Sequence, residues 1–573
     1  MKGKNSKSTS KIFIIFTLFC FILIVFRTSY LALSTNIDGI NIKEFANDRT
    51  IVKTSIPASR GTIYDVNGDV LAQNVSSYTL IAYLDPERSK DQKKLYHVED
   101  KVTTAEKLST AIEMKKEDIL DILNQEGLYQ VEFGYAGKNL TEMEKEKIEA
   151  LSLPGIDFIE DEKRYYPNGD FASYTIGYAK KNEDGIITGE LGIEALLDSA
   201  LKGVNGEITY QKDRDGRKIA GTKELKVDAK NGDDIYLTID SNIELFVEQA
   251  LRENFGKYPS EWAVAVVADA KTGKILAASQ KPSYDPNILN IKNYMDITVS
   301  TPYEPGSIMK IYTYMAAMEK GTYDGTKTFL SGKYKLEDGT VINDWNPYGW
   351  GDITYDQGFY ASSNVGVINI VNNFIDKNIL KDYFKKAGFG EKTGITLANE
   401  QPGKISFTYE SEVYNAAFGH GITTTPMQHI QALTSIANDG VMLKPYIVDK
   451  VVNSDGETIY KGEKTEVATI ASKKTTDYIK QLMYDTVHSS WNAATATMYR
   501  VPGYDVIGKT GTAQLVNANT GKYYTDNYNS IKSFVGMWPK DDPQIIIYIS
   551  AKKIIFNQLN VEDCKNKYFI WYI

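Results

Sequence analysis

The sequence predicts a multidomain α+β protein in which an N-terminal membrane anchor precedes two folded domains. Three observations support this prediction. With 573 residues the chain is too long for one hydrophobic core. A long apolar run occupies residues 12–26. Strand-like and helix-like patterns alternate through the rest of the chain, and their character changes near residue 235, where we place the domain boundary.

The composition restricts the class of protein. The chain is 42% hydrophobic and 24% charged, which is typical of a globular protein. A net charge of -9 argues against a nucleic-acid partner, which would require a basic face. The four histidines lie far apart, so we expect no metal site and no cofactor. Cys20 lies in the apolar run and Cys564 near the C-terminus, so we expect no internal disulfide.

Residues 12–33 are predicted to form a transmembrane helix. Extending the apolar run through Arg27, whose side chain can reach the lipid head groups, gives a span of about 33 Å. Residues 1–11 contain four lysines and no acid, which predicts a short cytoplasmic tail and an extracytoplasmic remainder in a single-pass protein of the cell membrane. A cleaved signal peptide is the alternative, because residues 32–34 resemble a cleavage site.

The first domain, residues 34–234, has a mixed pattern. Residues 55–74 alternate apolar and polar positions about the turn pair Asn67-Gly68, which predicts a hairpin. Residues 103–153 place apolar residues every three or four positions, which predicts helices. Residues 203–234 are polar and rich in turn residues, as in a hairpin followed by a linker.

The second domain, residues 235–573, has strands at both ends and helices between them. Residues 234–240 predict a strand, 241–255 a helix, and 262–279 two apolar strands about a turn. Further strands are expected at 533–539 and 544–553. This order predicts an antiparallel sheet covered by helices.

Ser307 and Lys310 lie three residues apart in "YEPGSIMK", at the start of a predicted helix. Residues at this spacing share one face, so the lysine amine can reach the serine hydroxyl. A serine nucleophile needs such a base, and burial or the helix dipole can lower the pKa of a lysine enough to supply one. Alone the pattern is weak, because Ser8 and Lys11 repeat it in the tail and Ser307 could simply cap a helix.

Two further motifs follow in a fixed order. Ser362 and Asn364 precede an apolar helical run, and Lys509-Thr510-Gly511 lies on a predicted strand. Each has an ordinary interpretation, as a helix cap and a hairpin end. The ordered set Ser-x-x-Lys, Ser-x-Asn and Lys-Thr-Gly nevertheless resembles the signature of the penicillin-recognising serine acyl-transferases.

That signature implies a role for each motif. Ser362 would relay a proton to the leaving amine, and the Asn364 amide would hold a substrate carbonyl. Lys509 would supply a fixed positive charge. The hydroxyls of Thr510 and Thr512 would bind a carboxylate, and Gly511, which also lies in this segment, would let the substrate backbone lie against the strand.

Most of residues 52–553 resembles a class B penicillin-binding protein. "RGTIYDVNGDVLA", "GELGIEALLDSALKG" and "DRDGRKI" resemble its pedestal, or dimerisation, domain. "YEPGSIMK", "SSNVG", "GHGITTTPMQ", "GYDVIGKTGTAQ" and "FVGMWPKDDP" resemble its transpeptidase domain. The implied fold is an elongated α+β pedestal over 34–234 and a penicillin-binding domain over 235–573, with an antiparallel sheet sandwiched by helices. Residues 554–573 differ from the family's usual end and predict a truncated or altered terminus.

The resemblance also implies a reaction, peptidoglycan D,D-transpeptidation by a serine-type enzyme. Ser307 would attack the penultimate D-alanine of a stem peptide ending in D-Ala-D-Ala, and an amine of a neighbouring strand would take the acyl group. Backbone N–H groups of Ser307 and Thr512 would form the oxyanion hole, and β-lactam antibiotics would acylate Ser307. A separate glycosyltransferase membrane protein is expected as a partner, because the sequence contains no recognisable glycosyltransferase domain.

Two further residues are candidates for the substrate groove. His420 stands where the family usually has a glutamine-like residue, and we expect either a groove position or structural hydrogen bonds. Trp345 could line the groove or be an ordinary packing aromatic. Arg60 and Asp65 are expected to pair with each other in the pedestal.

Three alternative functions remain open at this point. A D,D-carboxypeptidase differs only in using water as acceptor. A β-lactamase is disfavoured by the long first domain and by the absence of a motif for a water-activating carboxylate. A catalytically impaired scaffold of the wall-synthesis machinery is the third.

Overall fold

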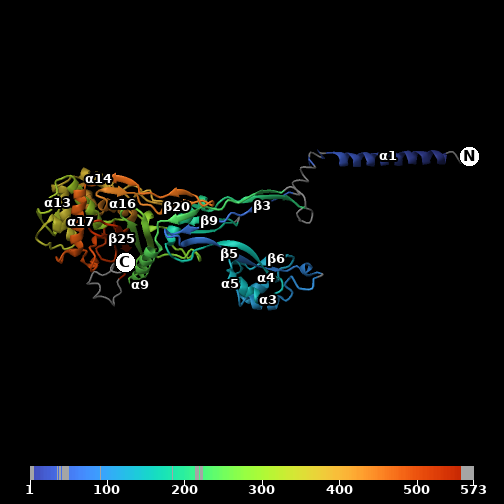
Figure 1. Cartoon of the computed structure of the whole chain (residues 1–573), viewed down its shortest axis with the longest axis horizontal. Coiled ribbons are helices and arrows are strands. Elements are labelled where there is room, and N and C mark those ends of the chain that lie inside the picture. Colours follow the sequence, from blue (N-terminus) through green and yellow to red (C-terminus); the bar gives the residue numbers. More distant parts are fainter. Residues whose placement is uncertain are drawn as a thin grey trace. The chain divides into compact units, whose positions relative to one another are not determined.

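The computed structural model describes residues 5–34, 36–37, 40–41, 51–90, 92–182, 185–212, 219 and 224–555. Most of the atypical end, 556–573, and the first four residues of the predicted tail lie outside the described residues. The chain divides into two compact units, one of Met1–Ala58 with Gly203–Asn231 and one of Ser59–Lys202 with Gly232–Ile573 (Figure 1).

The first unit contains the apolar helix and a small sheet. Helix α1 spans Asn5–Leu33, and its segment Ser10–Leu33 is long and apolar enough to cross a membrane, with no part of it buried. It therefore fits a single-pass anchor. The sheet pairs β10 (Gly206–Gln211) with β3 (Ile51–Ile56) and β11 (Leu225–Val227), all antiparallel. Strands β1 (Asn36–Ile37) and β2 (Ile40–Asn41) form a separate pair.

The second unit begins with a seven-stranded sheet that joins strands from both sides of residue 235. The predicted hairpin is confirmed, because β4 and β5 pair antiparallel and Gly68 lies in the connecting turn at φ +94°. β12, at the predicted domain boundary, runs parallel to β4 and antiparallel to β20. The strands are β4 (Ile63–Tyr64), β5 (Val70–Tyr83), β6 (Gln130–Glu132), β7 (Ile156–Tyr165), β12 (Asp234–Leu237), β20 (Val448–Val452) and β21 (Thr458–Lys461).

Three short helices pack beside β5 and β6 (Figure 1). They are α3 (Lys101–Leu108), α4 (Lys116–Leu123) and α5 (Glu142–Glu149). α4 and α5 lie within the segment 103–153 predicted from periodicity, and α3 begins two residues before it. Their inward residues form a separate core with Leu80 and Phe133. Ile119 and Leu123, one turn apart on α4, are fully buried there, as the spacing of apolar residues requires.

The expected pair of Arg60 and Asp65 is wrong. Arg60 is buried and pairs with Glu194 at 2.7 Å and Asp198 at 2.6 Å. Asp65 instead closes its own turn, where its carboxylate accepts the backbone N–H of Asn67 at 2.8 Å. The N–H groups of the turn and the N–H of Ser241, from the start of the helix that follows β12, occupy this carboxylate, so it is not available to Arg60.

The second half of this unit is built on a five-stranded antiparallel sheet. The predicted strands over 262–279 and 544–553 are confirmed, and the strand expected from 533 begins at Ser530. The strand order is β14 (Ile275–Lys281), β13 (Trp262–Asp269), β25 (Ile545–Lys552), β24 (Ser530–Trp538) and β23 (Ile507–Gln514). β23 is therefore an edge strand.

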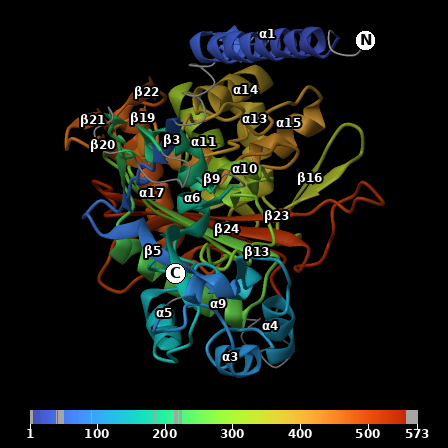
Figure 2. The same cartoon turned by 90° about the vertical axis from the view of Figure 1, so that its right-hand side faces the viewer.

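Helices cover both faces of this sheet, which confirms the predicted sandwich (Figure 2). Alternate residues of β13 enter different cores, because successive side chains of a strand point to opposite faces. Ala263 and Ala265 pack with α9 (Ser241–Lys257), whereas Val264 and Val266 belong to the large core that contains α11 (Lys310–Glu319) and α16 (Pro426–Ala437).

The remaining elements complete the second unit. The 3-10 turn η3 (Gly306–Met309) leads directly into α11. The other helices include α6 (Ser173–Ile176), α7 (Gly192–Leu196), α8 (Asp198–Leu201), α10 (Ile297–Ser300), α12 (Tyr355–Tyr360), α13 (Asn364–Asn373), α14 (Lys377–Lys386), α15 (Glu410–Ala417) and α17 (Lys473–His488). Short strand pairs are β8 (Tyr178–Lys181) with β9 (Ile187–Leu191), β15 (Thr328–Leu330) with β18 (Asp352–Thr354), β16 (Lys333–Lys335) with β17 (Val341–Asn343), and β19 (Val441–Leu443) with β22 (Glu466–Thr469).

Candidate active site

The turn that carries Ser307 is held between the edge strand β23 and a loop that precedes α16. Gly306 adopts φ +60°, and its N–H donates to the carbonyl of Gly419 at 3.1 Å. A Cβ atom added at Gly306 would lie 2.5 Å from the carbonyl oxygen of Thr512. Only glycine allows this approach, so the Pro-Gly pair brings the serine against the strand. The predicted helix start is one turn of 3-10 helix before α11 begins.

Lys310 is fully buried directly beneath this turn. Its Nζ donates to the carbonyl and, at 3.3 Å, the hydroxyl of Ser362, and to Asn364 Oδ1 at 2.8 Å. Burial lowers the pKa of Lys310 to about 7, although the negative charge of Asp344 acts in the opposite direction and raises it. Among the described residues, the Ser307 hydroxyl has no hydrogen-bond partner. The expected hydrogen bond from the Lys310 amine to this hydroxyl is therefore not formed here, because the amine is directed to Ser362 and Asn364.

Ser362 is not the helix cap that its ordinary interpretation required. The cap of α13 is Ser363, whose hydroxyl accepts the N–H of Gly366 at 2.8 Å and donates to Asp344 at 2.9 Å. Ser362 adopts φ +54°, a conformation that is costly for a residue other than glycine. The strain is typical of a functional position, and it leaves the Ser362 hydroxyl between two lysines.

Lys509 is the second of these lysines. It is fully buried on β23, and its Nζ donates to Ser362 Oγ at 2.8 Å and to the carbonyl of Thr510 at 3.0 Å. Burial, together with the charge of Lys310, lowers the pKa of Lys509 well below its ordinary value. Burial is the larger cause of this shift, and two ammonium groups that share one hydroxyl in a buried site also disfavour each other.

The rest of the strand motif lies around the nucleophile turn. A Cβ atom at Gly511 would be 2.9 Å from the carbonyl oxygen of Pro305 and 3.0 Å from Ile308. Gly511 therefore leaves room for the nucleophile turn. The sequence had suggested only that this glycine leaves room for the substrate backbone. Thr510 donates its hydroxyl to Thr495 at 3.0 Å, whereas Thr512 is exposed.

Trp345 lies close to the second motif. Its indole N–H donates to the carbonyl of Ala361 at 2.7 Å, and its ring meets that of Trp350 with centroids 5.3 Å apart. The side chain remains 53% exposed. It is therefore both a packing aromatic and an accessible surface next to Ser362.

Among the described residues the His420 ring makes no hydrogen bond, which argues against one of its two expected roles. Both ring nitrogens are buried and have no hydrogen-bond partner among the described residues. The ring lies against Phe418 and Tyr523, with centroids 5.2 and 5.1 Å away. Burial and the nearby charge of Lys310 lower the pKa of His420 to about 4, so the imidazole is neutral.

Sequence reasoning missed two carboxylates of the site. Asp344 is buried and accepts the N–H groups of Val365 at 3.0 Å and Gly332 at 2.8 Å, which fixes the second motif. Glu304 accepts the N–H of Gly421 at 2.8 Å. Its position in "YEPGS" was a visible signal, whereas Asp344 lies in a loop without a periodic pattern.

The comparisons with known proteins agree with this geometry. The description "Penicillin binding protein transpeptidase domain" matches residues 263–553, and "Penicillin-binding Protein dimerisation domain" matches residues 55–237. The chain belongs to the class B penicillin-binding proteins. The peptidoglycan D,D-transpeptidase activity that the motifs predicted is thereby confirmed at the level of the family.

Relatives of this penicillin-binding protein span most of its length. Stage V sporulation protein D of Bacillus subtilis is 29% identical over 552 residues, covering 94% of this chain and 80% of that protein. PbpB of Mycobacterium tuberculosis is 28% identical over 513 residues, covering 86% and 74%. The crystal structure of penicillin binding protein 2X from Streptococcus thermophilus is similar with a TM-score of 0.74 and 30% identity, covering 91% of this chain and 79% of that one.

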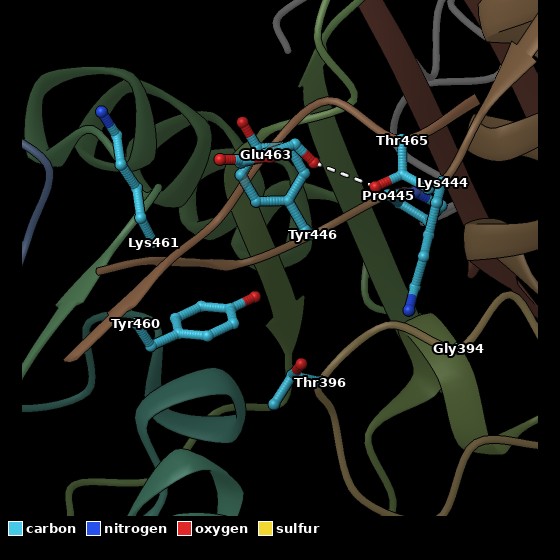
Figure 3. Close-up of a pocket in the computed structure, with 9 residues that line it drawn as sticks. All are labelled: Gly394, Thr396, Lys444, Pro445, Tyr446, Tyr460, Lys461, Glu463 and Thr465. Carbon is cyan, nitrogen blue, oxygen red and sulfur yellow. Dashed lines mark hydrogen bonds between the residues drawn. The ribbon is translucent and has the colours of Figure 1, made fainter. Parts of the chain in front are cut away.

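A separate pocket of this penicillin-binding protein holds none of the predicted site residues (Figure 3). It has a volume of about 200 Å³ and lies among β21, the segment that follows it and two loops. Its lining residues are Gly394, Thr396, Lys444, Pro445, Tyr446, Tyr460, Lys461, Glu463 and Thr465. The chemistry of the motifs therefore does not belong to this pocket.

Proposed function

We propose that this transpeptidase cross-links peptidoglycan stem peptides through a covalent acyl-enzyme on Ser307. The observation that carries the proposal is that Lys310 and Lys509 both donate hydrogen bonds to the hydroxyl of Ser362. Among the described residues, the hydroxyl of Ser307 has no hydrogen-bond partner. This arrangement supports proton transfer on both sides of one acyl carbon.

Acylation needs Lys310 without its proton. The buried amine takes the proton of Ser307 as Oγ attacks the carbonyl carbon of the penultimate D-alanine. Backbone N–H groups of Ser307 and Thr512 stabilise the oxyanion. The carbon–nitrogen bond then breaks, and the amine of the terminal D-alanine receives a proton through Ser362. A β-lactam carbonyl acylates Ser307 by the same steps.

The substrate carboxylate decides how the two lysines share protons. In the described site the two buried amines disfavour joint protonation. A carboxylate at Thr510 and Thr512 favours the ammonium form of Lys509 and leaves Lys310 as the neutral base. Asn364, which already receives one Lys310 hydrogen bond, orients a substrate carbonyl with its amide. His420 and Trp345 line the groove.

The chain's organisation is part of the proposal. Residues 1–11 form a cytoplasmic tail, 12–33 cross the membrane, and the pedestal over 34–234 carries the catalytic domain over 235–573 outside the cell. A separate glycosyltransferase membrane protein supplies the glycan strands.

The test is acylation by a labelled penicillin, followed by mass over time. We expect a stable adduct in the wild-type chain and none in Ser307→Ala. Rapid turnover of the adduct would indicate a β-lactamase, and no adduct at all a scaffold. With a D-Ala-D-Ala peptide and an amine acceptor, a hydrolysed product alone would indicate a carboxypeptidase.

A further inference from the structure

A carboxylate with one unpaired oxygen lies three residues before the nucleophile in the chain. Glu304 Oε1 accepts the N–H of Gly421 and the hydroxyl of Tyr523, both at 2.8 Å. Glu304 Oε2 is buried and has no hydrogen-bond partner among the described residues. Glu304 precedes Ser307 by three residues on the clamped turn, so the two backbones are at most about 10 Å apart.

His420, which packs on Tyr523, contributes two further buried nitrogen atoms. Neither Nδ1 nor Nε2 has a partner in the described part of the chain, and the ring packs on Tyr523. Tyr523 thus touches both side chains, since its hydroxyl bonds to Glu304. Proteins pair nearly all of their buried polar groups, so three unpaired atoms around one tyrosine indicate an incomplete binding site.

The charge of the site selects its ligand. The donor peptide ends in a carboxylate, which the lysines and threonines of the other motifs attract and which Glu304 repels. The cationic group in the reaction is the primary amine of the acceptor peptide. We propose that Glu304, His420 and Tyr523 form the acceptor subsite and bind this protonated amine, a proposal that rests on the acyl-enzyme function proposed above.

The subsite can also prepare the amine for attack. The ammonium group gives one proton to the carboxylate of Glu304, and the neutral nitrogen attacks the carbonyl carbon of the Ser307 ester. The new carbon–nitrogen bond forms and the bond to Oγ breaks, while the second nitrogen proton passes through Lys310 to Ser307 Oγ. Glu304 then releases its proton to solvent. Burial raises the pKa of Glu304 against the hydrogen bonds from Gly421 and Tyr523, which suits it to hold this proton.

Tyr523 is a positioning residue in this scheme. It lies in the hairpin between β23 and β24, where Val516 and Tyr523 form a bridge. Its hydroxyl holds Oε1 and leaves Oε2 for the ligand. Because Oε2 is buried, the groups that cover it have to move aside for the acceptor to enter.

The experiment measures how the acyl group on Ser307 is partitioned between hydrolysis by water and transfer to an added nucleophile. The full chain in detergent is supplied with a small acyl-D-alanine thioester and with either glycinamide, a primary ammonium at pH 7, or hydroxylamine, which is neutral there. We expect Glu304→Gln to reduce transfer to glycinamide, relative to hydrolysis, by about tenfold or more. Transfer to hydroxylamine should change less than about twofold, because it needs no carboxylate.

Two controls make the outcome decisive. Glu466→Gln makes the same chemical change at an exposed position of β22 and should alter neither ratio. Acylation by labelled penicillin, measured in parallel, separates the two proposals: an unacylated wild-type chain contradicts the acyl-enzyme function. The acceptor subsite is contradicted if an acylated Glu304→Gln variant keeps the wild-type ratio of glycinamide transfer to hydrolysis. It is also contradicted if transfer to glycinamide and transfer to hydroxylamine fall by the same factor. Should Glu304→Gln fail to fold, His420→Ala decides on the same two ratios.

Discussion

The pH dependence of acylation tests the central role of Lys310. The perturbation is a change of pH from 5 to 9 with the rate of acylation by a labelled penicillin as the readout. Burial lowers the pKa of Lys310 to about 7. The neutral amine is the active form, so the rate should fall about tenfold for each pH unit below 7 and level off above it.

The magnitude follows from the shift itself. An ordinary lysine, with a pKa of about 10.4, would be neutral in roughly one molecule in a few thousand at pH 7. With a pKa of about 7, half of the Lys310 side chains are neutral at that pH. The difference corresponds to about 5 kcal/mol, which the desolvation of a fully buried ammonium can supply.

The assay should use the full chain and stopped-flow mixing, because the initial rate, not the final occupancy, reports the base. The apparent pKa belongs to the pair of Lys310 and Lys509, which share Ser362. A rate that keeps rising tenfold per unit to pH 9 would refute the reasoning, since Lys310 would then carry an ordinary pKa. Lys310→Ala should lose acylation at every pH in this range.

Three further predictions concern the packing around the site and the stability of the domain. Gly511→Ala places a methyl group 2.9 Å from the Pro305 carbonyl oxygen. Calorimetry should therefore show a free energy of unfolding lower by about 1–3 kcal/mol, and acylation should be at least about tenfold slower. Unchanged acylation would contradict the close approach. Ser363→Ala removes the cap of α13 and should lower the free energy of unfolding by about 1–2 kcal/mol in denaturant titration. The matched change Ser454→Ala, at an exposed turn position, should have no effect. Burial and the charge of Glu248 raise the pKa of Glu244 to about 8, above its unfolded value, so its contribution to stability is complete below pH 4.5 and is lost as the pH rises through 8. Thermal unfolding of Glu244→Gln should therefore depend less on pH between 5 and 9, and identical pH profiles for the variant and the wild type would exclude a protonated Glu244.

The elements with strong local patterns could be predicted from sequence. The apolar run of α1, the apolar segment that forms β13 and the three-to-four spacing in α3, α4 and α5 are each a pattern contained within a few neighbouring residues. The motif serines and lysines were found in the same way, because each motif is contiguous.

Pairings over long distances could not be predicted in this way. Arg60 was assigned to Asp65, five residues away, whereas its true partner Glu194 is 134 residues away. Similarly, Tyr523 reaches Glu304 across 219 residues. No local pattern contains such a pair, so these contacts became known only from the folded chain.

The sequence by itself determined which residues could perform the chemistry and that they lie beyond an apolar anchor, because both facts are properties of short segments. Only the tertiary structure decided that Lys509 meets Ser362 across 147 residues, that Ser363 caps the helix in place of Ser362, and that Gly511 admits the nucleophile turn. It also decided the direction in which the pKa values of both lysines shift. Burial sets the cost of holding a charge, and burial exists only once distant segments have packed together.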